Sequence, residues 1–297
     1  MASDQSFGGD WTDAKLQVLR GYLSAYTMAL RNTPFRKVYI DAFAGTGYRR
    51  PRPGIREPEN QGELFPDLAA YPPQELLAGS ARIALECEPP FDEYRFIERD
   101  EDRCSALADL AREFPDRESR VIIRPGDANE ELLALCRGDW RGRRAVVFVD
   151  PFGMQVHWDT IAAIAGTRAM DLWLLFPLGI GVNRLLLRSA EIPAPWQDKL
   201  DAFLGTPQWR EALYRRQPEQ TSLFGSGDDV RIKTTVDEIG HFFLDRLRTV
   251  FPGVAAEPGV LRNSRNSPLY LFCFAASNAR GAPIALRIAT HLLQGLR

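Results

Sequence analysis

Apolar and polar positions along the chain follow two different periods, which predict helices and buried strands in turn. From about Asp10 to Leu30, large apolar residues recur at three- and four-residue steps, the stripe of an amphipathic helix. Short runs rich in β-branched and aromatic residues follow, and such runs are typical of parallel strands covered on both faces. They occupy residues 38–40, 94–97, 121–123, 145–149, 171–176 and 269–275.

Helical stretches between these runs predict the fold class. Strands alternating with helices indicate an α/β fold with a doubly wound, Rossmann-like sheet and helices on both faces. We expect the helix of residues 10–30 to be a plain covering helix. The first crossover helix is expected after Gly79, with Ser80 as its N-cap.

Two stretches interrupt the alternation and suggest insertions. Residues 48–78 are rich in proline and glycine and predict a loop insertion. Residues 179–230 show only short helical pieces with scattered aromatic residues, which predicts a small inserted helical cap with the aromatic residues as its small core. Residues 1–178 and 231–297 are then the Rossmann-like core.

Composition limits the classes of protein that this chain can be. At 297 residues with 45% hydrophobic content, it can bury one large core with a smaller appended lobe. A net charge of −2 argues against a general polyanion-coating surface, although local patches can still bind nucleic acid. The four cysteines are scattered without a Cys-x-x-Cys spacing, so we expect reduced thiols and no metal site. No apolar run reaches membrane-spanning length, and the first residues do not show a basic region followed by an apolar core. These patterns predict a cytoplasmic protein with no membrane partner.

The first predicted strand ends in an acid and a loop of small residues. Small side chains let backbone N–H groups approach a ligand closely, and in open α/β sheets this happens at the carboxyl edge of the strands. We therefore interpret this segment as a cofactor-binding loop; a tight turn that binds nothing is the alternative. The candidate binding residues are Asp41, Phe43, Ala44, Gly45 and Gly47.

The type of cofactor follows from what the loop has and lacks. Arg50 stands where the dinucleotide fingerprint has its third glycine, which disfavours NAD. A strand, an acid and Phe-Ala-Gly-x-Gly together resemble the first motif of class I S-adenosylmethionine-dependent methyltransferases. The resemblance implies S-adenosylmethionine as the cofactor, with Asp41 near its methionine end and the glycines facing it.

Acids also follow the second and third strands. Glu98 ends the second strand, where a carboxylate can hold both ribose hydroxyls of a nucleotide; a surface carboxylate is the alternative. It lies 57 positions after Asp41, and the 48–78 insertion explains the long separation. The methyltransferase resemblance implies that Asp127 contacts the adenine amino group. Asp127 can instead cap a helix that starts near Glu130.

The fourth strand runs into Asp150-Pro151-Phe152-Gly153. In amino-directed methyltransferases, an acid or amide, prolines and an aromatic residue stand at this position, so the resemblance implies Asp150, Pro151 and Phe152 as catalytic residues that hold and orient a target amine. The pattern departs from Asp-Pro-Pro followed by an aromatic residue, and the tetrapeptide also resembles that of tRNA guanine-N2 dimethyltransferases. A strand-terminal turn without a catalytic role is the alternative.

Four segments together resemble the three-Cys-motif partner protein family. They are IDAFAGTG at 40–47, FIERD at 96–100, VDPFG at 149–153 and LYLFCFAASN at 269–278. Members of this bacterial family are similar to class I methyltransferases and are often encoded beside a protein with a three-cysteine motif. The resemblance therefore implies such a protein as a partner, and the cysteine motif belongs to that partner.

Two functions from different classes fit these patterns. The first is an S-adenosylmethionine-dependent methyltransferase that acts on an amino group, for which a nucleobase in a nucleic acid is one candidate. The second is a catalytically silent, methyltransferase-like protein that binds a three-cysteine-motif partner. Acids at the ends of four consecutive strands favour cofactor binding, because unpaired carboxylates at such positions otherwise have no role.

Overall fold

A computed structural model describes residues 9–46, 79–151, 153–187, 189–216, 231–263 and 265–296. Within these residues, eight strands form one sheet in the order β3-β2-β1-β4-β5-β10-β8, with β9 also paired to β10. The strands are β1 (Arg36–Asp41), β2 (Glu93–Glu98), β3 (Val121–Pro125), β4 (Arg143–Val149), β5 (Met170–Phe176), β8 (Gly253–Val254), β9 (Gly259–Arg262) and β10 (Pro268–Ala276).

The direction of the strands confirms the doubly wound α/β fold. Strands β1 to β5 are parallel to their neighbours, and β10 is antiparallel to β5. From β1 the chain adds β2 and β3 on one side and then returns to add β4 and β5 on the other. The order therefore reverses between β1 and β4, and ligands of open α/β sheets bind outside the carboxyl ends of the strands at such a point.

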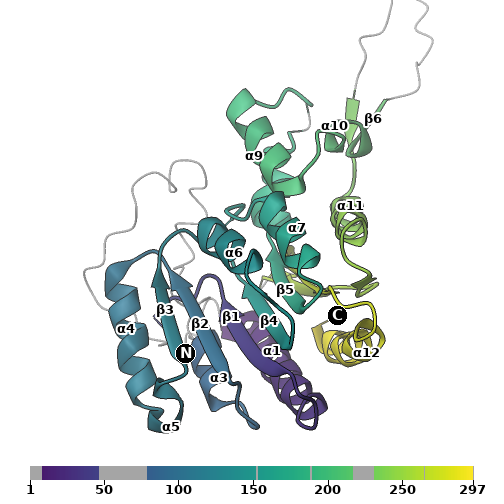
Figure 1. Ribbon diagram of the computed structural model, residues 1–297. Coiled ribbons are helices and arrows are strands. Elements are labelled where there is room, and N and C mark those ends of the chain that lie inside the picture. Colours follow the sequence, from purple (N-terminus) through teal and green to yellow (C-terminus); the bar gives the residue numbers. More distant parts are fainter. Residues whose placement is uncertain are drawn as a thin grey trace, which may run out of the picture.

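Helices cover both faces of this sheet (Figure 1). Helix α1 packs beside α3 and α12, whereas α6 packs against α7. The bounds of the helices on the α1 side are α1 (Gly9–Ala29), α3 (Ser80–Glu86), α4 (Glu101–Arg112) and α12 (Ala282–Leu293). The other large helices are α6 (Ala128–Cys136), α7 (Trp158–Gly166) and α11 (Val236–Arg248), and α5 (Pro115–Glu118) is a single turn.

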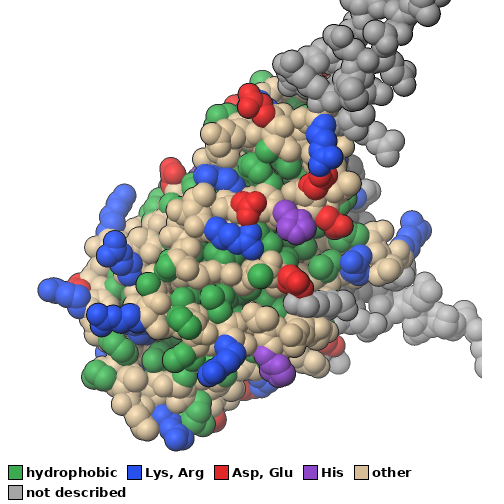
Figure 2. Space-filling view, turned by 90° about the vertical axis from the view of Figure 1, so that its right-hand side faces the viewer, with side chains coloured by type: hydrophobic (Ala, Val, Ile, Leu, Met, Phe, Trp, Pro, Cys, Tyr) green, Lys and Arg blue, Asp and Glu red, His purple; other side chains and the backbone are tan. Residues whose placement is uncertain are grey.

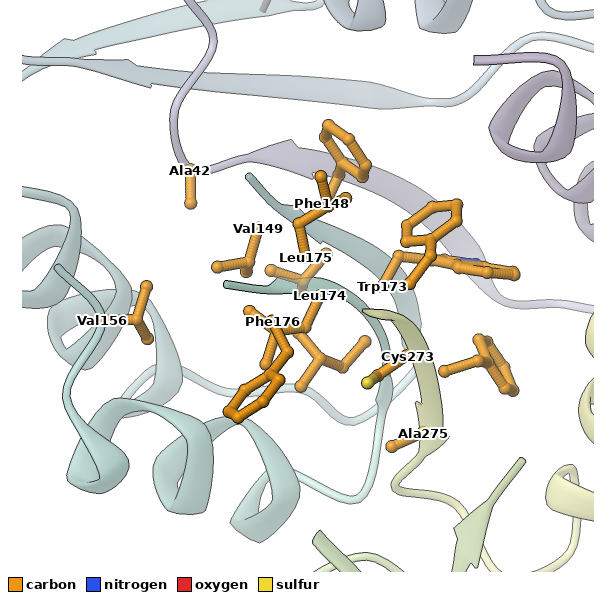
Figure 3. Close-up of a cluster of buried hydrophobic side chains, with 14 of the residues drawn as sticks. Ala42, Phe148, Val149, Val156, Trp173, Leu174, Leu175, Phe176, Cys273 and Ala275 are labelled. Atoms are coloured by element: carbon orange, nitrogen blue, oxygen red, sulfur yellow. The ribbon is translucent and has the colours of Figure 1, made fainter. Parts of the chain in front are cut away.

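Aromatic rings show which side chains of β5 face which helix layer. Trp173 meets Tyr22 of α1 with 5.1 Å between ring centroids, and Phe176 stacks on Phe243 of α11 at 4.1 Å. Because side chains alternate along a strand, positions of odd and even number in β5 point to opposite faces. Figure 3 shows this alternation in the buried core, where Phe148 lies with Trp173 on one side.

The predicted cap contributes to the main core as well as to its own packing. The stretch from Leu178 to Lys233 includes the predicted cap of residues 179–230. It contains a π-helical turn (Leu178–Val182), α8 (Asn183–Leu185), α9 (Ala194–Leu204), α10 (Trp209–Ala212), β6 (Tyr214–Arg216) and, just after the cap, β7 (Arg231–Lys233). Phe203 of α9 stacks with both Phe176 and Phe243, at 5.6 and 5.8 Å between centroids. Residues 217–230 and the predicted 48–78 insertion lie outside the described residues, and the division into core and insertions stays a prediction.

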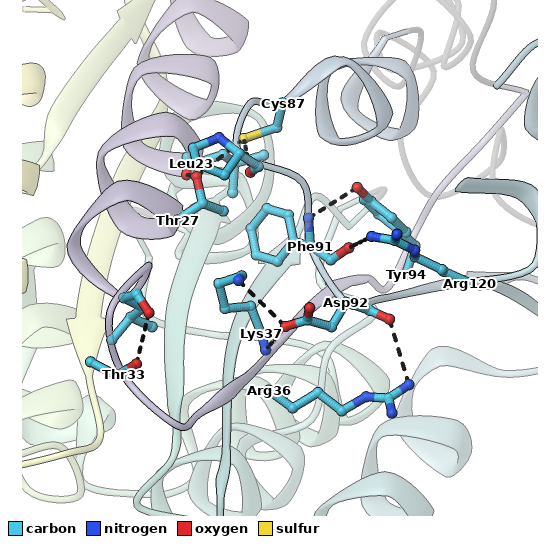
Figure 4. A network of polar contacts seen from close by, with 12 residues as sticks. Leu23, Thr27, Thr33, Arg36, Lys37, Cys87, Phe91, Asp92, Tyr94 and Arg120 are labelled. Atoms are coloured by element: carbon cyan, nitrogen blue, oxygen red, sulfur yellow. Dashed lines mark hydrogen bonds and ion pairs between the residues drawn. The ribbon is translucent and has the colours of Figure 1, made fainter. Parts of the chain in front are cut away.

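Polar contacts fix the amino edge of the sheet, opposite the carboxyl ends (Figure 4). The backbone N–H of Lys37 donates to the Asp92 carboxylate at 2.7 Å, and the Lys37 ammonium lies 3.5 Å from the same group. Nearby, the backbone N–H of Phe91 donates to the Tyr94 hydroxyl at 3.1 Å. These contacts join the start of β1 to the loop that enters β2.

Two surface properties bear on partners. No helix among the described residues is long and apolar enough to cross a membrane. Figure 2 shows the face at the right-hand side of Figure 1, where acidic, basic and hydrophobic side chains are interspersed. This face therefore carries no continuous basic field of the kind that coats nucleic acid.

Candidate functional site

Two carboxylates flank the point where the strand order reverses. Asp41 is the last residue of β1, and Asp150 directly follows β4, the strand that pairs with β1. Asp41 stands opposite Phe148 in the register, so its side chain shares a face of the sheet with Phe148 and, two residues further, with Asp150. Both carboxylates are buried, with 4% of Asp150 exposed. The structure thus brings together two acids that the sequence separates by more than a hundred positions.

Helix α1 supplies a positive charge to this pair. The Lys15 ammonium donates to Oδ2 of Asp150 at 2.5 Å, and the Lys15 side chain is 0% exposed. It also lies 5.7 Å from the centroid of the Phe148 ring. This helix therefore covers the sheet, as expected, and in addition contributes a buried cation to the end of β4. The signal in the sequence was a lysine within the apolar stripe, four positions before Leu19.

The Asp41 carboxylate is buried and accepts hydrogen bonds from within the protein. Tyr39 donates its hydroxyl at 3.1 Å, and the backbone N–H of Phe43 donates at 3.4 Å. Burial raises the pKa of Asp41 to about 7, even though these donors and the nearby Ser80 hydroxyl lower it; Asp150 raises it further. The carboxyl group of Asp41 is therefore poised to lose its proton near neutral pH.

Ser80 does not have the role expected from the sequence. Gly79, with a φ of 119°, is the N-cap of α3, and Ser80 is the first residue of the helix. The reason is conformational: a left-handed φ at this position suits glycine and strains other residues. The buried Ser80 hydroxyl faces the Asp41 carboxylate, whose pKa it lowers, and makes no other hydrogen bond to the part of the chain that the structure describes. Such a hydroxyl at the site can also serve a ligand.

Glu98 binds the glycine loop directly. Its Oε2 accepts a hydrogen bond from the backbone N–H of Gly45 at 3.0 Å, and its Oε1 accepts from Arg99 and Asp100 at 2.9 and 3.0 Å. Only 8% of Glu98 is exposed, so it is not a surface carboxylate. Gly45 has a φ of 60°, and Ala44 beside it is fully buried. Because a carboxylate oxygen can accept two hydrogen bonds, Oε2 retains one acceptor position with respect to the described residues.

Asp127 is exposed and caps helix α6, which was one of its two predicted roles. Its Oδ1 accepts from the backbone N–H groups of Asn129 at 2.9 Å and Glu130 at 3.3 Å. Both bonds use the same oxygen, so Oδ2 is left for another donor as far as the described residues show. The contact with adenine stays a prediction. The loop that carries Asp127 does approach Glu98, since Gly126 donates its backbone N–H to the Glu98 carbonyl at 3.1 Å.

Asn129 is a buried connector that the sequence did not reveal. Its amide donates to the carbonyl of Gln155 at 2.8 Å, and its oxygen accepts from the backbone N–H of His157 and the hydroxyl of Thr160, both at 2.9 Å. One side chain from α6 thus fixes the segment between Asp150 and helix α7. An asparagine in the first turn of a helix gives no sequence signal for such a role.

The remaining predicted residues are described only in part. Pro151 is buried, and Phe43 is partly buried against the core. Phe152 and Gly47 lie outside the described residues. Gly153 has a φ of 70°, a left-handed conformation that the turn after Asp150 requires and that glycine adopts without strain.

The groups at the site fit the parts of S-adenosylmethionine. Its ammonium group needs an anion, which Asp41 offers beside the hydroxyl of Ser80. Its ribose needs hydrogen-bond acceptors, and among the described residues only the Gly45 N–H donates to Oε2 of Glu98, which can accept a second hydrogen bond. The residues present are therefore compatible with this cofactor.

The described part of the chain contains no set of side chains arranged to bind a metal ion. No three His, Cys, Asp or Glu side chains gather there as metal ligands do. The four cysteines are free thiols, and Cys87 and Cys273 are buried. Burial raises the pKa of both thiols, which keeps them protonated.

Comparison with known proteins concerns the fold. No protein-family model and no curated protein matches the chain. LPL1258 from Legionella pneumophila, of the family DUF519, is 12% identical, with a TM-score of 0.47 over 97% of this chain and 93% of its own. YhhF from Escherichia coli, a proposed methyltransferase, is 11% identical, with a TM-score of 0.29 over 58% of this chain and 74% of its own. A conserved hypothetical protein from Streptococcus pyogenes is 16% identical, with a TM-score of 0.31 over 57% of this chain and 82% of its own.

Similarities of this size carry no argument about activity. The fold and the buried acids define a candidate ligand site at the carboxyl edge of a doubly wound sheet. The resemblance to the three-Cys-motif partner protein family, which no comparison tests, stays a prediction.

Proposed function

We propose that the chain is an S-adenosylmethionine-dependent methyltransferase that acts on an uncharged amino group, such as that of a nucleobase. One observation carries the proposal. Buried acids stand at the carboxyl ends of β1, β2 and β4, around the point of strand reversal, and the second of them, Glu98, binds the Gly45 backbone. Burial of carboxylates is costly even where hydrogen bonds and an ion pair offset part of the cost, and a polar ligand that uses these acids would account for their position.

Each acid has a distinct task in this proposal. Asp41 pairs with the ammonium group of the cofactor's methionine part, and Glu98 accepts a hydrogen bond from its ribose. Asp127, whose Oδ2 is left over after capping α6, accepts one from the adenine amino group. When bound, S-adenosylmethionine supplies an electrophilic methyl group on sulfur.

Asp150 holds the acceptor. Its carboxylate accepts a hydrogen bond from the N–H of the target amine, which directs the nitrogen lone pair towards the methyl group and lets orientation contribute to the rate. When bound, the cofactor would supply its methyl group to this nitrogen with loss of the bond to sulfur, and the nitrogen would release its proton to solvent. The charge of Asp150 is matched by Lys15, so the pair suits an uncharged acceptor better than a cationic one.

The proposal also includes two binding partners. A nucleic acid would present the amino group, and a three-cysteine-motif protein would bind elsewhere on the surface. The competing proposal is a silent partner protein, which the buried Lys15–Asp150 ion pair also allows, because that pair can serve as a structural link.

Calorimetric titration with S-adenosylmethionine and S-adenosylhomocysteine, with NAD as the control, tests the cofactor first. We expect saturable binding of the first two alone. The second step incubates the protein with tritium-labelled S-adenosylmethionine and bacterial total RNA or DNA and counts acid-precipitable label. In Asp150→Asn, we expect binding to persist and transfer to fall. Binding without transfer to any acceptor pool would favour the silent partner, and absence of binding would remove the proposal.

A further inference from the structure

The Lys15–Asp150 ion pair is unusual because of where its charges lie. Lys15 belongs to the apolar face of α1 and is completely buried, with its ammonium on Oδ2 of Asp150. Removing two charges from water costs several kcal/mol, and replacing such pairs by apolar residues often makes proteins more stable. An apolar residue at position 15 would continue the stripe of α1. Packing therefore gives no reason for a lysine here.

The surroundings of Asp150 explain what the lysine can do. Burial raises the pKa of Asp150, and Lys15 lowers it again. Other titratable groups face the same space: Asp41 ends β1 one strand away, and Tyr39 of β1 interacts electrostatically with both acids. The positive charge of Lys15 thus offsets the repulsion between the Asp41 and Asp150 carboxylates.

The contact also selects one oxygen of the carboxylate. Lys15 binds Oδ2, and no other described residue donates a hydrogen bond to Asp150. Lys15 is held in turn by the Phe148 ring, 5.7 Å away, which packs in the same layer as the Asp150 side chain. The carboxylate therefore has a defined orientation set by two elements far apart in the sequence.

We propose that Lys15 is a positioning residue of the transfer site: it fixes Oδ2 of Asp150 as a carboxylate oxygen and leaves Oδ1 to accept a hydrogen bond from an uncharged acceptor nitrogen. The inference rests on the proposed function. It assigns to α1 a part in the reaction that the motifs of the sheet do not contain, and it makes Lys15 act through Asp150 and not on the cofactor.

The first measurement follows the Asp150 carboxyl group without any need for turnover. Carbon-13 NMR of protein labelled at aspartate carboxyl groups, with Asp150 assigned by its loss in Asp150→Asn, gives the titration midpoint. In Lys15→Met we expect the midpoint to rise by about 1 to 3 pH units, because a neighbouring cation lowers an aspartate pKa by that amount. Lys15→Gln, which keeps an N–H donor without the charge, covers the case in which Lys15→Met does not fold.

Lys37→Met is the matched control. Lys37 also makes an ion pair with a partly buried side chain, 3.5 Å from Asp92, but at the amino edge of the sheet. We expect it to leave the Asp150 midpoint and methyl transfer unchanged. An unchanged Asp150 midpoint in Lys15→Met or Lys15→Gln would overturn the proposal.

The second measurement compares transfer and cofactor binding in the same variants. We expect kcat for transfer to nucleic acid to fall by about 100-fold in Lys15→Met, since misplacing a reacting group has effects of that size, while affinity for S-adenosylhomocysteine changes less than threefold. Unchanged kcat and KM, or lost cofactor binding, would overturn the positioning role. If the wild-type protein transfers no methyl group, the proposed function fails, and the NMR titration alone then decides whether Lys15 positions Asp150.

Discussion

The backbone N–H of Gly45 donates a hydrogen bond to Oε2 of Glu98 at 3.0 Å, across 53 positions of sequence. The glycine loop after β1 and the acid at the end of β2 are therefore one unit. A change at Glu98 acts on the loop as well as on any ligand. This coupling distinguishes Glu98 from an acid that only contacts ribose.

Removing the Glu98 carboxylate tests this unit. In Glu98→Ala we expect the dissociation constant of S-adenosylmethionine to rise by about 10- to 100-fold, because a hydrogen bond to a charged group is worth about 1.5–3 kcal/mol. Calorimetry measures the constant. Asp109→Asn, at an exposed acid paired with Arg112, is the control and should bind as the wild type does. Equal affinities in Glu98→Ala and the control would exclude Glu98 from the site.

Cofactor affinity should depend on pH through Asp41. The pKa of Asp41 is raised to about 7, so its carboxyl group is mostly neutral at lower pH. A cationic ligand binds the ionised form better, and affinity for S-adenosylmethionine should therefore increase between pH 5.5 and 7.5. In Asp41→Asn we expect weaker binding that is flat across this range. Titrations at four pH values compare the slopes, and parallel slopes for both proteins would contradict the assignment.

Asp127 combines two predicted roles that a pair of variants can separate. Asp127→Ala removes the N-cap of α6 and should cost about 1 kcal/mol of stability, measured by urea unfolding. Asp127→Ser keeps a good N-cap and removes the carboxylate. We expect Asp127→Ser to be as stable as the wild type but to bind S-adenosylmethionine more weakly. Wild-type affinity in Asp127→Ser would show that Asp127 only caps the helix.

Loss of the Asn129 side chain should disturb the segment after Asp150. Asn129→Ala leaves the buried hydroxyl of Thr160, the N–H of His157 and the carbonyl of Gln155 without their partner. We expect the free energy of unfolding to fall by about 1–3 kcal/mol, the cost of such unsatisfied groups. KM for the acceptor should rise more than the dissociation constant of the cofactor. Asn32→Ala, at an exposed asparagine, is the control; a matching loss of stability there would refute the connector role.

Most of the sheet could be predicted from local pattern. Runs of β-branched and aromatic residues mark the five parallel strands and β10, because most of these strands are buried on both faces. The edge strand β3 is only partly buried, yet its short apolar run still marks it. The acids at strand ends follow from the same runs. Strands β8 and β9, of two and four residues, are too short to give a periodic signal.

The contacts that complete the site could not be predicted in the same way. Lys15 and Asp150 are 135 positions apart, and only the packing of α1 on the sheet shows that they meet. The cap of α3 was assigned to Ser80 because serine favours that position, yet the backbone at Gly79 takes a left-handed conformation. Tertiary structure decided both, as it does wherever distant segments share a small buried space.

The stacked rings of Phe176, Phe203 and Phe243 bear on protein engineering. They join β5, α9 and α11, with interplanar angles of 15°, 20° and 5°. Excising residues 179–230 to obtain a minimal catalytic unit would therefore leave Phe176 and Phe243 without the ring that covers them. A shortened protein would need polar replacements at both positions to remain monodisperse.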